Sequence, residues 1–140
     1  MAKRRRTRRG QAYTEFVLVV PGMILLMFLI MEFAYFWWAR MVSSTATFEA
    51  ARAVAGGQPV DEGYALYDQL LDGGLGGLAG RNRGQVTIER RPHLRSVDAR
   101  ADAPYQGVSG LGWLLGDLRL KSSAFFRLEG FYPGPADEFE

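Results

Sequence analysis

The longest apolar stretch of the chain, FVLVVPGMILLMFLIMEFAYFWW, runs from Phe16 to Trp38 and carries a single charge, Glu32. A helix of this length would measure about 35 Å, against roughly 30 Å of membrane hydrocarbon. In lipid, a lone segment must satisfy its backbone polar groups internally, which a helix does. The sequence therefore predicts one membrane-spanning helix, which we assign to residues 11–38.

Basic residues are concentrated just before this helix. Of the 17 Lys and Arg residues in the chain, six precede position 10, and the remaining sequence is slightly acidic. By the positive-inside rule, this run places the N-terminus in the cytoplasm and the residues after residue 38 on the opposite side. Because the charge adjoins an apolar helix, it favours lipid over nucleic acid as the partner. The residues predicted to orient the helix are Lys3, Arg4, Arg5, Arg6, Arg8 and Arg9.

Two other interpretations of the apolar stretch fit less well. A cleavable secretory signal has a shorter apolar core and a small-residue cleavage site, whereas this stretch ends in Tyr35, Trp37 and Trp38. The core helix of a soluble protein does not explain the charge asymmetry. Pro21 beside Gly22 predicts either a local kink or simple tolerance, because both residues are common in membrane helices.

The glutamates at the two ends of the stretch need separate explanations. A helix places Glu15 and Glu32 about 100° apart around its axis, so they do not form a paired carboxylate site. Glu32 is interpreted as an interfacial side chain that reaches the headgroups. If the chain were cut after Gly10, the new α-amino group of Gln11 would be largely protonated and one helical turn from Glu15. The two charges would then offset each other's burial cost, within one subunit or between neighbours.

The segment RRGQAYTEF followed by a long apolar helix resembles the processing signal of the type IV pilin superfamily. The leader Arg8 to Ala12, the pairs Glu15-Phe16 and Glu32-Phe33, and Ala50 to Arg52 resemble the TadE-like pilus assembly proteins. The resemblance implies cleavage between Gly10 and Gln11 by a prepilin peptidase. It also implies roles for Glu15, Phe16 and Glu32 in helix pairing and assembly, although many pilins have phenylalanine where this chain has Gln11.

The rest of the chain predicts an α+β fold. Small and apolar residues recur every three or four positions from Ala39 to Val54, which extends the helix to about Ala55. A short helix over 61–72, a flexible glycine-rich connection over 73–84, and strands over 85–91, 96–105 and 118–132 follow. The long N-terminal helix, transmembrane in its first half, would pack on a small antiparallel sheet, as in a pilin-like lollipop. We expect a basic leader (1–10), a transmembrane helix (11–38), its periplasmic continuation (39–57) and a small α+β periplasmic domain (58–140).

No catalytic set emerges from the sequence. The chain has no cysteine, one histidine (His93), and no spacing typical of a nucleophile–base pair or a metal site. We therefore expect no enzyme activity, cofactor, metal, small-molecule substrate or nucleic-acid partner. The expected partners are membrane lipid, a prepilin peptidase, other pilin or pseudopilin subunits and the pilus assembly platform.

The expected function is that of a structural minor pilin or pseudopilin of a Tad-type (Flp) adhesive pilus, located in the bacterial inner membrane or in the pilus. One alternative is an uncleaved, single-pass accessory protein that binds a partner through its periplasmic domain. A third, a membrane-bound enzyme or regulator, is disfavoured by the lack of a recognisable site.

Overall fold

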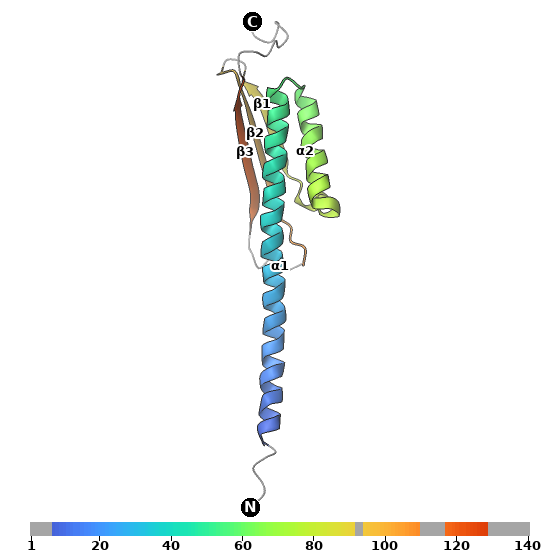
Figure 1. Ribbon diagram of the computed structural model, residues 1–140, viewed down its shortest axis with the longest axis vertical. Coiled ribbons are helices and arrows are strands. Elements are labelled where there is room, and N and C mark those ends of the chain that lie inside the picture. The colour runs from blue at the N-terminus through green and yellow to red at the C-terminus, as the bar shows by residue number, and fades with distance from the viewer. Residues whose placement is uncertain (1–6, 92–93, 110–116, 129–140) are drawn as a thin grey trace, which may run out of the picture.

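The computed structural model describes residues 7–91, 94–109 and 117–128, with side chains from Ala12 onward. A long helix comes first in the chain, followed by a shorter helix, two 3-10 turns and three strands (Figure 1). The elements are α1 (Thr7–Ala55), α2 (Val60–Leu75), η1 (Gly76–Leu78), η2 (Gly80–Asn82), β1 (Gln85–Arg91), β2 (Ser96–Pro104) and β3 (Arg119–Arg127).

Helix α1 runs without interruption through Pro21 and forms the long axis of the molecule (Figure 1). It begins at Thr7, earlier than the start near Gln11 that the sequence predicts. Its end at Ala55 is as predicted. Gly57 adopts a φ of 107°, a left-handed conformation that glycine reaches without steric cost, and its N–H donates to the carbonyl of Val54 at 3.1 Å.

The three strands form one antiparallel sheet in the order β1-β2-β3. Ala99 is the central register position, opposite Ile88 on β1 and Ala124 on β3. All three residues face the interior, since side chains alternate between the two faces of a strand. The strand predictions are therefore confirmed, although β3 ends at Arg127 and residues 129–132 lie outside the described part of the chain.

The upper part of α1 and α2 cover one face of the sheet, which confirms the predicted α+β arrangement (Figure 1). The predicted stripe on α1 provides much of this contact and is fully buried at Ala39, Ala46, Ala50 and Val54. These small side chains therefore pack within the chain's own domain. Polar contacts add to the packing between α1 and the sheet: Thr47 Oγ1 lies 2.7 Å from Ser122 Oγ on β3.

Glycines set the spacing between α1 and α2. A methyl group at Gly74 would lie 2.5 Å from a side-chain carbon of Val42, so the two helices approach closely because this position has no side chain. The sequence predicts a flexible connection over 73–84. The structure instead places the end of α2, η1 and η2 there. Glycines in this stretch therefore allow the two helices to pack closely, and they also allow the chain to turn after α2.

Candidate functional site

The lower half of α1 presents a continuous apolar surface. From Ala12 to Met31 every side chain is exposed except Val20 and Leu29, which are half-buried. The helix is long and apolar enough to cross a membrane, and only 6% of its most hydropathic 18-residue window is buried within the chain. A buried helix of a soluble protein would be covered by its own domain, so this half of α1 is a candidate membrane anchor.

The residues predicted for processing and assembly lie along this anchor. The Gly10–Gln11 bond is inside α1, and Glu15 and Phe16 are exposed on it, Phe16 by 66%. Arg8 and Arg9 also belong to the first turn of α1, whereas Lys3, Arg4, Arg5 and Arg6 lie outside the described residues. Glu32 is 17 positions from Glu15, or about 26 Å along a helix, so the structure does not bring the two glutamates together.

Glu32 is the site that the structure defines most sharply. Its side chain has no exposed surface, although it sits at the lower end of the folded domain. One carboxylate oxygen accepts hydrogen bonds from the Tyr105 hydroxyl and the Val108 N–H, each at 3.0 Å. The other accepts from the N–H of Ser109 at 3.0 Å and from its hydroxyl at 2.6 Å. We call residues 105–109 the cradle; charge-assisted bonds of this kind are about twice as strong as neutral ones.

Groups from three other parts of the chain hold the cradle in place. The Tyr105 N–H donates to the carbonyl of Leu118, just before β3, at 2.9 Å. The N–H of Gln106 donates to Oδ1 of Asn82, a fully buried residue of η2, also at 2.9 Å. The Tyr105 ring packs edge-on against Phe36 of α1, with ring centroids 5.2 Å apart. The cradle is thus fixed to the sheet, to η2 and to α1.

The position of Tyr105 beside Glu32 makes its hydroxyl harder to deprotonate. Burial, followed by the hydrogen bond to Glu32 and the charge of that carboxylate, raises the pKa of Tyr105 well above the usual value for a tyrosine. The hydroxyl therefore remains a donor across the physiological range. Four donors of the cradle bond to the two oxygens of the Glu32 carboxylate, and these hydrogen bonds offset the cost of burying it.

The headgroup interpretation of Glu32 is wrong in this structure, because the carboxylate is enclosed by the chain itself. Sequence reasoning missed Tyr105, Val108 and Ser109, which are more than 70 positions away. One signal was available: Glu32 lies seven positions before Ala39 and so continues the buried stripe of α1. That position predicts a side chain facing the domain.

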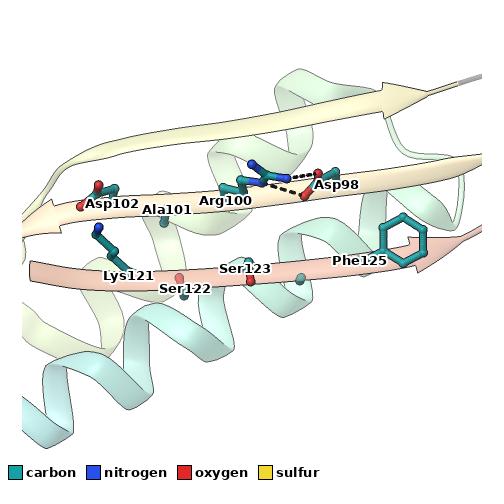
Figure 2. Close-up of a pocket in the computed structure, with 9 residues that line it drawn as sticks. Asp98, Arg100, Ala101, Asp102, Lys121, Ser122, Ser123 and Phe125 are labelled. Atoms are coloured by element: carbon teal, nitrogen blue, oxygen red, sulfur yellow. Dashed lines mark hydrogen bonds and ion pairs between the residues drawn. The ribbon is translucent and has the colours of Figure 1, made fainter.

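The outer face of the sheet is a second, open surface (Figure 2). It carries ion pairs between Arg100 and Asp98 at 2.8 Å, and across strands between Arg119 and Asp102 at 2.7 Å. The second of these pairs joins β2 to β3. Phe125 projects from β3 beside these charges and is 66% exposed. Within the described ranges, no group of three His, Cys, Asp or Glu residues is placed to hold a metal ion.

Comparison with known families bears on the helix that carries Glu15 and Glu32. Residues 10–52 match the family model described as TadE-like protein. The chain carries a TadE-like segment. The match spans roughly a third of the chain, from Gly10 to Arg52, and confirms the resemblance noted from the sequence. It indicates involvement in Tad pilus assembly.

The TadE-like segment contains the exposed apolar part of α1 and most of the part that packs on the sheet. Both glutamate–phenylalanine pairs fall within it. No curated protein and no solved structure matches the chain.

Proposed function

We propose that this chain is a structural minor pilin or pseudopilin that takes part in assembling a Tad-type (Flp) adhesive pilus. The observation that carries the proposal is the match of residues 10–52 to the TadE-like family, over a helix whose lower half is largely exposed in the described part of the chain. The helix would anchor the protein in the bacterial inner membrane, with the N-terminus cytoplasmic and the α+β domain periplasmic. The protein would act by assembly rather than by catalysis.

Processing would change the physical state of the anchor. Cleavage of the Gly10–Gln11 bond by a prepilin peptidase would remove the six basic side chains that hold the N-terminus at the cytoplasmic surface. The new ammonium group of Gln11 would lie one turn from Glu15 and could pair with that carboxylate, in the same subunit or in a neighbour. The helix could then leave the lipid and pack with other pilin or pseudopilin helices on the assembly platform.

Mass spectrometry of the N-terminus of the purified protein tests processing directly. The expected result is a chain beginning at Gln11 in cells with a prepilin peptidase and at the original N-terminus in cells without it. A Gly10→Val variant should stay uncut, while Gly22→Ala, where a methyl group meets no atom within 4 Å, should be processed normally. An intact leader in cells with the active peptidase would overturn the processing step.

One observation favours the alternative of an uncleaved accessory protein. Helix α1 continues through the Gly10–Gln11 bond, so a peptidase would have to unwind the first turn to reach it. Gly10 lowers the cost of unwinding, because glycine disfavours the helix by about 1 kcal/mol relative to alanine. In this alternative, the protein stays a single-pass anchor and its domain binds a partner of the pilus machine. The same mass spectrometry of the N-terminus distinguishes this uncleaved protein from a processed pilin.

A further inference from the structure

The lower limit of the folded domain lies at Glu32, well before the end of the predicted membrane span at residue 38. The three side chains nearest that limit on the buried face of α1, Glu32, Phe36 and Ala39, are 0%, 9% and 0% exposed. Below Glu32, the side chains of α1 from Met31 back to Ala12 are exposed, apart from the half-buried Leu29 and Val20. The change in burial therefore occurs within about one turn of the helix, and Glu32 is the first fully buried side chain.

This limit restricts how deep α1 can sit in a membrane. If the hydrocarbon reached Trp38, it would extend about 9 Å beyond Glu32 and surround the cradle, which is bonded to that residue. The cradle is irregular backbone with an exposed Gln106, and lipid-exposed irregular backbone is not tolerated in hydrocarbon. Either the cradle opens on insertion, or the hydrocarbon ends below Glu32.

The length of the exposed helix matches the second possibility. Ala12–Met31 comprises 20 residues, which span about 30 Å as a helix, the thickness of the hydrocarbon layer. The residues from Phe33 to Arg40 would then lie in the headgroup layer and at its outer edge. The position of this short segment is fixed by the apolar helix below and by the folded domain above.

The side chains in this segment suit lipid headgroups. Phe33, Trp37 and Trp38 are each slightly more than half exposed, and the amphipathic ring of tryptophan is enriched at this depth. The guanidinium carbon of Arg40 lies 5.7 Å from the centre of a Trp37 ring, so a cation sits at the upper edge of the aromatic cluster, where lipid phosphates are found. Val108 of the cradle, exposed by 39%, adds an apolar side chain beside Glu32.

We propose that these five residues, Phe33, Trp37, Trp38, Arg40 and Val108, form a basal collar with which the folded domain docks directly on the lipid headgroups. The inference rests on the membrane insertion in the proposed function and adds a specific lipid-contact surface on the domain. It places the membrane boundary at Glu32 and leaves no spacer between bilayer and domain. Since the strands run alongside α1 (Figure 1), the open face of the sheet would stand upright from the membrane and stay free for other contacts.

The absence of cysteine from the chain makes a site-specific test direct. Full-length variants with one cysteine, at Leu25, Val108 or Phe125, would be labelled with an environment-sensitive bimane and placed in vesicles of phosphatidylethanolamine and phosphatidylglycerol. A fraction of the lipid would carry a nitroxide on its headgroup, and the protein-to-lipid ratio would be varied. All three side chains are exposed, so the substitutions leave the core intact.

The collar predicts that headgroup nitroxide quenches bimane at Val108 several-fold more than at Phe125, at every protein-to-lipid ratio. Unlabelled Leu25→Cys should resist a membrane-impermeant maleimide. Reaction at Leu25 would overturn membrane insertion and the collar with it. Protection at Leu25 with equal quenching at Val108 and Phe125 would overturn the collar alone. If quenching at Val108 disappears as the protein-to-lipid ratio rises, a protein neighbour covers this surface. That result would also overturn the lipid assignment.

Discussion

The carboxylate of Glu32, on the long helix, accepts a hydrogen bond of 3.0 Å from the hydroxyl of Tyr105, 73 positions later in the chain. This contact ties the helix at the lower limit of the domain to the segment that joins β2 to β3. With Val108 and Ser109 it leaves a fully buried carboxylate in contact with four donors. The pair therefore connects the TadE-like segment to the rest of the fold.

Removing the Glu32 carboxylate should destabilise the domain. In Glu32→Ala the cradle N–H groups lose their acceptor, and leaving buried donors unpaired costs about 1–3 kcal/mol. Glu32→Gln keeps the size and part of the bonding, so its effect should be smaller. The free energy of unfolding of the full chain in detergent micelles measures both. Glu49→Ala is the matched control, because Glu49 forms a surface pair with Arg52 at 3.9 Å, and such exposed pairs contribute little to stability.

Comparison with Glu49→Ala also shows which results would contradict this prediction. If Glu32→Ala is no more destabilising than Glu49→Ala, the cradle contributes nothing to domain stability. If Glu32→Gln is as damaging as Glu32→Ala, the negative charge rather than the enclosed shape is what the cradle requires.

The raised pKa of Tyr105 predicts a loss of stability in alkali. An unfolded tyrosine loses its proton near pH 10, whereas the folded state holds it to higher pH. The unfolded state therefore binds fewer protons above that value. The contribution of Tyr105 is complete below about pH 10 and declines as pH rises toward its folded pKa, by up to about 1.4 kcal/mol per pH unit.

Tyr105→Phe should lower stability at neutral pH and flatten its decline above about pH 10. Unfolding titrations followed by circular dichroism, from pH 7 to 11, check both effects. Some slope should remain, since burial also raises the pKa of Tyr67. An alkaline slope that is unchanged in Tyr105→Phe would contradict the assignment.

A methyl group between the two helices should be costly at Gly74. In Gly74→Ala it would meet the side chain of Val42 at 2.5 Å, and overpacking of this kind typically costs about 1–3 kcal/mol. The double variant Gly74→Ala/Val42→Ala should recover part of the loss. Gly73→Ala is the control, because a methyl group there meets no atom within 4 Å and alanine favours the helix.

Thermal unfolding in detergent measures this series. Equal effects of alanine at Gly73 and Gly74 would show that α2 is not held closely against Val42. A double variant that is as unstable as the sum of the two single changes would show that the two positions do not interact.

The regular elements could be predicted because each has a repeating pattern. Val97, Ala99 and Ala101 alternate with charged residues along β2, and the stripe ending at Val54 repeats every three or four residues on α1. These patterns also predict which face of each element is buried. The helix end at Ala55 follows from the glycine pair after it.

The cradle could not be predicted in this way. Its contact with Glu32 depends on how the β2–β3 connection returns to the helix, and irregular segments such as Tyr105–Ser109 carry no period. The ordered structure of the glycine-rich stretch, residues 73–84, could not be predicted for a related reason. A methyl group at Gly84 would overlap the carbonyl of Asp102, and one at Gly74 would overlap Val42, so these glycines reflect tertiary neighbours that local sequence does not reveal.

Glu15 provides the test of how the processed helix assembles. If its carboxylate pairs with the new amine of Gln11, Glu15→Ala should reduce the amount of this protein in pilus fractions several-fold while the cut after Gly10 proceeds. Glu15→Asp, which keeps the charge on a shorter side chain, should retain part of the assembly, whereas Glu15→Gln should behave like Glu15→Ala. Mass spectrometry of the N-terminus and immunoblots of sheared pili measure the two steps separately. Normal incorporation of Glu15→Ala would contradict the pairing, and normal incorporation of Glu15→Gln alone would show that a neutral hydrogen bond is sufficient.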